Sequence, residues 1–197
     1  GERGISIGWP VSLVRVLGPA TVKDFDPFLM LDSFDSTNPE DYIAGFPFHP
    51  HRGIETISYI YRGKMTHGDS LGNEDTITDG EVQWMTAGSG IMHEEKLPAS
   101  ERMLGVQLWL NMRAKEKMEN PGYKRIKSTD IQEVPIEGGK IRVLAGTYEK
   151  TEGFKGKHLP LNYYDIHLKE NASITLKTEQ DKSVVCFTLL GDVNIEG

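Results

Sequence analysis

The sequence predicts an all-β protein whose short strands form a sandwich or a barrel. The chain has 21 glycines among its 197 residues, and its short apolar runs are separated by Gly, Pro, Asn or Asp. Short apolar runs with frequent turn residues are typical of such folds. The clearest strand is residues 103–112. There Leu104, Val106 and Leu108 alternate with residues of other types, as expected for an extended backbone with one apolar face.

The first part of the chain, residues 1–126, is expected to form one β domain. Its expected strands are residues 12–17, 28–32, 54–61, 81–86 and 103–112. Residues 35–44 are polar and predict an irregular segment, and residues 114–119 suit one or two helical turns before Pro121.

A second β domain is expected after a linker. Residues 127–139 are polar and contain Pro135 and two consecutive glycines, which predicts the linker. Residues 140–197 then begin a domain whose sequence pattern resembles that of the first part. Its expected strands are residues 141–144, 163–168, 173–176 and 184–190. Because the chain stops six residues after Gly191, where a sheet should continue, we expect this domain to be incomplete.

Composition excludes several classes of function. The net charge is −7 and the isoelectric point is about 5.4, which argues against direct binding to nucleic acid because phosphate contacts need a basic surface. Cys186 is the single cysteine, so an intramolecular disulfide is not expected. No apolar run approaches the roughly 20 residues of a membrane span. A cytoplasmic protein is expected, or a nuclear one if the source is eukaryotic.

Two histidines, His49 and His51, stand just before the strand expected at residues 54–61. Side chains two residues apart point to the same face of an extended chain, so both imidazoles can converge on one point. The His-Pro-His sequence alone is also compatible with an ordinary turn, because histidine is common on surfaces and Pro50 favours turns.

A second pair of the same kind favours a metal site. His93 and Glu95 are also two residues apart, and they follow a Gly-Ser-Gly sequence that lets the backbone bend tightly. Brought together, the two pairs supply three imidazoles and one carboxylate, whereas Glu94 would point away from His93. Such a set suits Fe(II), with Mn, Ni, Cu or Zn as competitors.

The other histidines and one arginine are interpreted as structural. His67 precedes Gly68-Asp69 and is expected in a turn, outside the ligand set. His158 and His167 are isolated in the sequence and are expected to be ordinary structural or surface residues. Arg52 is expected to pair with a carboxylate, with a contact to substrate as the alternative.

Several stretches of the chain resemble the pirin family of the cupin superfamily. They are residues 26–32 (DPFLMLD), 49–56 (HPHRGIET), 69–73 (DSLGN), 82–88 (VQWMTAG) and 90–95 (GIMHEE). The resemblance covers roughly residues 10–115. Beyond them only the general pattern of the sequence is similar. It implies a bicupin of two β-barrel (jelly-roll) domains, with one iron in the first. It assigns the metal to His49, His51, His93 and Glu95, and it places Glu55 outside the ligand set, where it would orient a ligand.

The resemblance also implies an activity. Some pirins are similar to quercetinases, which cleave flavonols with O₂ and release carbon monoxide. An aromatic substrate would then bind at the metal, beside walls formed by Phe46, Phe48 and Met85, and Glu95 would act as the base that removes the flavonol hydroxyl proton. Trp84 is a weaker candidate for the wall, since aromatic residues in such strands more often belong to the core.

Two alternatives remain open at this point. The protein could be an iron-dependent redox sensor that binds a protein partner, either in transcription or as a regulator of a metabolic enzyme. Alternatively, the metal could only hold the barrel together. An apolar pocket open to the metal would favour an enzyme, and a plugged one would suit a sensor.

Overall fold

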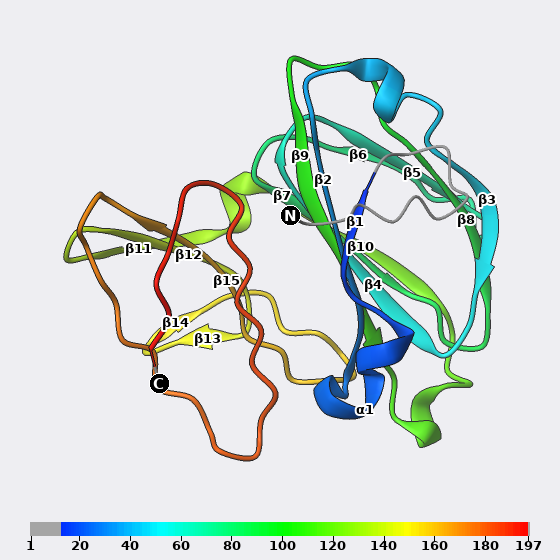
Figure 1. Ribbon diagram of the computed structural model, residues 1–197. Helices are drawn as coiled ribbons and strands as arrows, with labels where there is room; N and C mark the ends of the chain where they lie inside the picture. Colours follow the sequence, from blue (N-terminus) through cyan, green and yellow to red (C-terminus); the bar gives the residue numbers. More distant parts are fainter. Residues whose placement is uncertain (1–12, 197) are drawn as a thin grey trace.

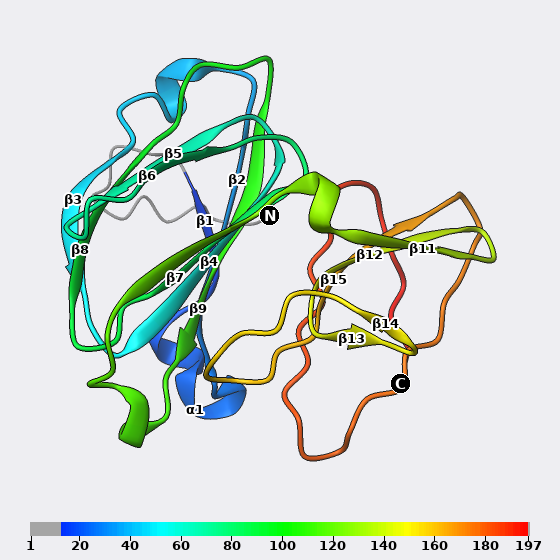
Figure 2. The same cartoon turned by 180° about the vertical axis from the view of Figure 1, so that it is seen from behind.

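The computed structural model describes residues 13–196, and Figure 1 shows an all-β architecture with a large first unit and a smaller second one. The first unit is a barrel flattened into two antiparallel sheets that face each other (Figures 1 and 2). The order of strands in the larger sheet is β1 (Val14–Leu17), β2 (Phe28–Ser36), β9 (Met103–Asn111), β4 (Ile54–Arg62), β7 (Glu81–Thr86) and β10 (Gly122–Ile126). The order in the smaller sheet is β3 (Phe46–His51), β8 (Ile91–Lys96), β5 (Met65–Asp69) and β6 (Glu74–Ile77).

The helical segments are short and lie in the connections of the barrel. They are η1 (Pro19–Thr21), α1 (Val22–Phe25), η2 (Pro39–Asp41), η3 (Ala114–Glu116) and η4 (Ser128–Asp130). Among the residues that the structure describes, no helix is long and apolar enough to span a bilayer.

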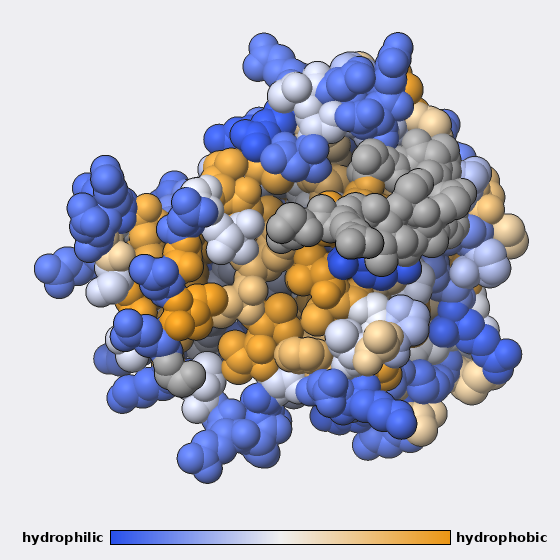
Figure 3. Space-filling view, in the orientation of Figure 1, coloured by the Kyte–Doolittle hydropathy of each residue, from blue (hydrophilic) through white to orange (hydrophobic). Residues whose placement is uncertain are grey.

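The second unit consists of smaller sheets. One holds β11 (Gln132–Ile136), β12 (Gly139–Ala145) and β15 (Tyr163–Leu168), and the other pairs β13 (Thr147–Tyr148) with β14 (Thr151–Glu152). This unit packs against the outer face of the larger barrel sheet. Leu144 and Ala145 of β12 share a buried apolar cluster with Ile57 and Leu108 of the barrel. Figure 3 shows apolar side chains gathered where the second unit meets the barrel.

The alternation of β9 explains how one sheet serves two purposes. Leu108 lies opposite Leu31 of β2 and Ile57 of β4, and all three are buried in the outer apolar cluster. The next residue towards the N-terminus, Gln107, faces the opposite way and donates to Ser58 and to Glu95 inside the barrel. Successive side chains of β9 therefore point alternately to the apolar cluster beneath the second unit and to the polar interior of the barrel.

The prediction of an all-β fold is confirmed, and the expected strands of the first part are present, although Ser12 lies outside the described residues. Two expectations for the second part were wrong. Residues 127–139 were expected as a linker, yet they contain β11, which pairs in antiparallel register with β12. Residues 173–176 and 184–190 form no strand, because no described strand pairs with them and an isolated strand cannot satisfy its backbone groups.

Candidate metal centre

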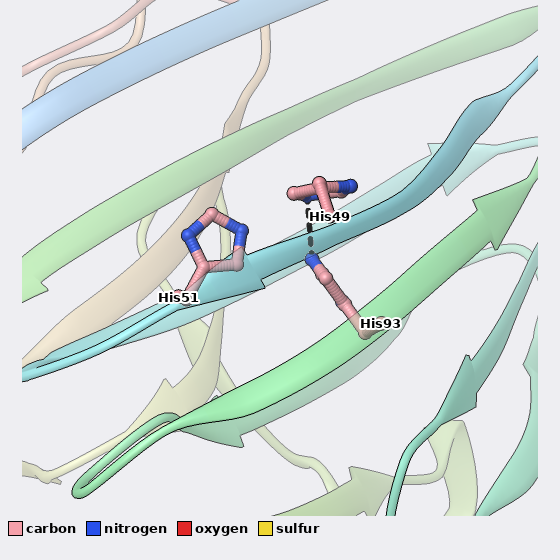
Figure 4. A group of neighbouring side chains, drawn as sticks. All are labelled: His49, His51 and His93. Carbon is pink, nitrogen blue, oxygen red and sulfur yellow. Dashed lines mark hydrogen bonds between the residues drawn. The ribbon is translucent and has the colours of Figure 1, made fainter.

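The candidate centre lies on β3 and β8, which are neighbours in the smaller barrel sheet. In their antiparallel register His49 stands directly opposite His93, and His51 stands opposite Ile91. The side chains of His49 and His51 point to the same side of β3 because they are two residues apart. Figure 4 shows the three imidazoles turned towards one another. The pairing of two strands thus brings together histidines that are 44 residues apart in the chain.

The nitrogen atoms of these imidazoles are close enough to share one ion. The Nε2 atoms of His49 and His93 are 2.9 Å apart, and one ring nitrogen of each of the three histidines lies within 4.8 Å of the others. The Nδ1 atom of His49 is 2.6 Å from the Pro47 carbonyl oxygen. We assign the proton of His49 to Nδ1, which donates to this carbonyl and leaves the lone pair on Nε2, as in many metal-binding histidines.

Burial keeps the inner histidines neutral. The cost of burying charge, increased by the neighbouring His49, lowers the pKa of His51 to about 4. Burial, with the nearby His49, His51 and His67, lowers the pKa of His93 to about 2. Neutral imidazoles are the form that binds metal ions, so these two residues need not lose a proton near neutral pH before coordinating a cation.

Glu95 lies on the same side of β8 as His93, with Met92 and Lys96 exposed on the other side. Its Oε1 atom is 3.8 Å from Nδ1 of His93, and both of its oxygens accept from Nε2 of Gln107, at 3.0 and 3.2 Å. Burial raises the pKa of Glu95 to about 7, opposed by the hydrogen bond from Gln107. The carboxylate thus stands beside His93, outside the set of three converging imidazoles. Its place as the fourth ligand stays a prediction.

His67 belongs to this interior, although the sequence suggested a turn. It lies within β5 and is only 1% exposed. Its Nε2 atom is 2.7 Å from Asp69, its Nδ1 atom is 3.5 Å from Nδ1 of His93, and its ring stacks on Tyr123. The alternation that identifies it, with Met65, His67 and Asp69 buried between less buried residues, is visible only in the folded strand. His67 therefore adjoins a ligand candidate from the far side.

The donor set fits a divalent metal. Three imidazoles converge, a buried carboxylate lies next to them, and Gln107 donates a hydrogen bond to that carboxylate. Buried charge of this kind is costly unless it is paired, and a cation would pair it. Imidazole and carboxylate ligands together suit Fe, Mn, Ni, Cu or Zn.

Comparison with known proteins places this geometry in a family. The family model described as Pirin matches residues 11–110, which include the three imidazoles and Glu95. The chain belongs to the pirin family. A Pseudomonas aeruginosa protein named as a candidate quercetin 2,3-dioxygenase is 40% identical over 199 residues, covering 98% of this chain and 70% of its own. Human pirin is 37% identical over 185 residues, covering 92% of this chain and 61% of its own.

Solved structures agree with the fold of this pirin. The structure of quercetin 2,3-dioxygenase from Acinetobacter baumannii matches with a TM-score of 0.74 and 34% identity, covering 82% of this chain and 60% of that one. The Escherichia coli pirin YhhW, solved in complex with nickel(II), matches with a TM-score of 0.61 at 22% identity, covering 83% of this chain and 66% of that one. The chain thus spans less than two thirds of these solved chains.

Glu55 of this pirin does not adjoin the centre, contrary to the expectation that it orients a ligand. It shares the outer face of β4 with Ile57 and Tyr59, which belong to the cluster beneath the second unit. Its Oε2 atom accepts from the indole N–H of Trp84 at 2.6 Å and from the hydroxyl of Thr86 at 2.7 Å. The expectation failed because alternation along β4 turns Glu55 away from the imidazoles.

The expected pocket walls Phe46, Phe48 and Met85 do not line the groove along β3 and β8, and their contact with a substrate stays a prediction. Phe48 is 52% exposed and directly precedes His49 in β3, so it faces solvent on the outer side of the strand. Phe46 packs against a buried cluster that includes Phe34 and Met65, and Met85 packs with Ala87 and Ile91. Trp84 belongs to the outer core, in agreement with its interpretation as a core residue.

A groove runs along β3 and β8 on the outside of the barrel and touches the centre at His51. It has a volume of about 570 Å³. The residues that line it are Pro50, His51, Arg52, Ser70, Gly90, Ile91 and Met92. Arg52 points its Nη2 atom at the sulfur of Met118, 3.1 Å away, and the expected carboxylate partner is replaced by this contact. His51 is the member of the imidazole set that the groove exposes.

Proposed function

We propose that this pirin is a metal-dependent dioxygenase that opens flavonols of the quercetin type with O₂. The observation that carries the proposal is the convergence of three imidazoles beside a buried carboxylate, with a groove that reaches one of them, His51. The likeness to the Acinetobacter baumannii quercetin 2,3-dioxygenase supports the choice of reaction. Iron is the proposed metal, since imidazole and carboxylate ligands with open positions are typical of Fe(II) oxygenases.

The protein residues have separate tasks in this proposal. His49, His51 and His93 hold the ion, with Glu95 as the proposed fourth ligand or as the base. The bound ion supplies Lewis acidity towards the flavonol hydroxyl and electron transfer towards O₂. A carboxylate with a pKa of about 7 suits proton removal near neutral pH, so Glu95 accepts the hydroxyl proton at one of its oxygens. Gln107 keeps that carboxylate turned inward by donating to it.

The groove supports an enzyme over a closed sensor. Its volume of about 570 Å³ lies within the range of about 300–1,000 Å³ that is usual for small-molecule sites. Ile91 and Met92 supply apolar surface to it, which suits an aromatic substrate. A sensor that transmits only the oxidation state to a protein partner would not need such a groove beside His51.

The decisive experiment loads the protein with Fe(II) without oxygen, adds quercetin and then admits O₂. We expect loss of quercetin absorbance together with release of carbon monoxide. Glu95→Gln should lower kcat strongly while metal content is measured in parallel, and Glu94→Gln, on the next residue but the other face, should leave kcat unchanged. Iron-loaded protein that leaves quercetin intact would rule out the proposed activity and favour the sensor.

A further inference from the structure

A second group of metal-binding side chains lies where the barrel meets the second unit. Glu116 ends η3 and Glu119 follows three residues later, whereas His158 belongs to the segment between β14 and β15. Nδ1 of His158 is 3.6 Å from Oε1 of Glu116 and 3.9 Å from Oε2 of Glu119. One ligand atom from each residue lies within 4.8 Å of the other two. The group is on other loops than β3 and β8, so it is distinct from the three-imidazole centre.

Two of its polar atoms are buried without a partner. The side chain of His158 is only 2% exposed, and its Nδ1 atom has no hydrogen bond. Oε2 of Glu116, on a side chain that is 16% exposed, is also buried and makes none. Buried polar atoms are almost always paired in folded proteins, because leaving them unpaired costs free energy. His158 was expected to be an isolated structural residue, and the structure instead aims it at two carboxylates.

Contacts that do not involve these three side chains hold each of the two loops against the barrel. The amide of Ser89 donates to the Glu119 carbonyl at 2.8 Å, and Nζ of Lys117 donates to the Gly53 carbonyl at 2.9 Å. On the other loop, Gly156 lies against Trp84, so that a Cβ there would stand 2.9 Å from the indole ring. The three side chains are therefore brought together by the fold rather than by their attraction for one another.

We propose that Glu116, Glu119 and His158 bind a second divalent cation of the Zn²⁺ and Mn²⁺ class, which joins the barrel to the second unit. One imidazole with two carboxylates is a donor set that such borderline cations accept. Two ligands of a tetrahedral zinc at its usual bond lengths stand about 3.4 Å apart. The observed separations of 3.6 and 3.9 Å need only small side-chain movements to reach that geometry. Water completes the coordination on the more exposed side of Glu119.

The competing explanation is a protonated His158 held by two carboxylates without any metal. Lys157 also competes, because its Nζ is 3.5 Å from Oε2 of Glu119, although its side chain is 80% exposed and free to move away. The two explanations differ in the response to Zn²⁺. An ion pair gains nothing from the metal, whereas a metal site gains stability as the concentration of free Zn²⁺ exceeds the dissociation constant.

The test uses chelator-treated whole chain and Zn²⁺ as the probe. We expect two equivalents of Zn²⁺ per chain by calorimetric titration and by metal analysis after gel filtration. His93→Asn should remove the equivalent bound in the barrel, and Glu116→Gln/Glu119→Gln should remove the other. In the His93→Asn background, Zn²⁺ should still raise Tm, and the added double substitution should abolish that rise. Glu152→Gln, on a 68% exposed side chain of the same unit, is the matched control and should keep two equivalents.

Two results would overturn the proposal. The first is a single equivalent in the unmodified chain, lost with His93→Asn. The second is a second equivalent that persists in the double variant. If the double variant fails to fold, Glu119→Gln alone, on a side chain that is 40% exposed, must still weaken the second equivalent by at least about tenfold, since it removes a ligand. An unchanged affinity in that variant also rejects the site.

Discussion

The two faces of the larger barrel sheet differ in chemistry although the same strands supply both. The inner face carries Ser58 and Gln107, and Gln107 donates both to Ser58 and to Glu95 beside the imidazoles. The outer face carries Ile57 and Leu108, buried beneath the second unit. The inner face can therefore accept polar residues because the outer face, covered by a second unit, provides much of the apolar burial. Function and stability are thus separated by the alternation of β4 and β9.

Ile57→Ala should have the largest effect on stability and little effect on the metal centre. Ile57 is 0% exposed and lies in the outer cluster, so its truncation leaves a cavity that costs about 2–5 kcal/mol. Chemical denaturation measures this loss, and metal titration of the folded variant should give the affinity of the unmodified chain. Met92→Ala, on a 46% exposed side chain of β8, is the control and should change stability by less than about 0.5 kcal/mol.

A substitution on the metal-binding side should instead weaken metal binding strongly and change stability little. His93→Asn removes a ring nitrogen that lies 2.9 Å from that of His49. We expect metal affinity in the barrel to fall at least about 100-fold, since even the loss of a group that merely orients a ligand costs about 10- to 100-fold. Glu94→Gln, the adjacent residue, should keep the affinity. A His93→Asn variant that binds as tightly as the unmodified chain would show that the imidazoles do not form the centre.

A polar contact between the barrel and the second unit should have an intermediate effect. The hydroxyl of Tyr59, on the outer face of β4, donates to Asp165 of β15 and accepts from Nη1 of Arg142, 2.9 Å away. Burial and the nearby Asp165 raise the pKa of Tyr59, so the hydroxyl keeps its proton. Tyr59→Phe removes one hydrogen-bond partner from Arg142 and one from Asp165. It should lower the free energy of unfolding by about 1–3 kcal/mol.

The matched control for this contact is Tyr61→Phe, two residues along the same strand. If the Tyr59→Phe variant keeps the stability of the unmodified chain, Arg142 and Asp165 do not need the hydroxyl as a hydrogen-bond partner. Arg142 also donates to Glu133 and to the Gly80 carbonyl, each at 3.1 Å, and to the Ser128 hydroxyl at 3.3 Å. Because it keeps these three partners, the expected loss of stability is well below that of an unpaired buried charge.

Sequence reasoning predicted what depends on local alternation. It placed His49 with His51, and His93 with Glu95, because side-chain direction in a strand follows from spacing alone. The expectation that Glu55 orients a metal ligand failed, because spacing does not reveal which face of a strand lies inside the barrel. That choice depends on what covers the other face, and here a unit more than 80 residues further along the chain covers it.

Proximity between distant loops was equally hidden from the sequence. Glu116 and His158 are isolated in the chain, and only the folded junction aims one at the other. The absent strands at residues 173–176 and 184–190 have the same kind of cause. A strand forms only where a neighbour pairs with it, and apolar composition alone supplies no partner.

The smallest expected effect concerns His67, which lies behind His93 on β5. His67→Phe keeps the stack on Tyr123 but removes the nitrogen atoms that face His93 and Asp69. Because the ring of His93 then loses a polar neighbour that orients it, metal affinity should fall by roughly tenfold, the lower end for such partners. Tyr123→Phe, which retains the stack, should leave affinity unchanged. A loss of metal affinity as large as that of His93→Asn would show that His67 is itself a ligand. An unchanged metal affinity would show that His67 serves only packing. The variant therefore decides whether His67 belongs to the metal-binding residues.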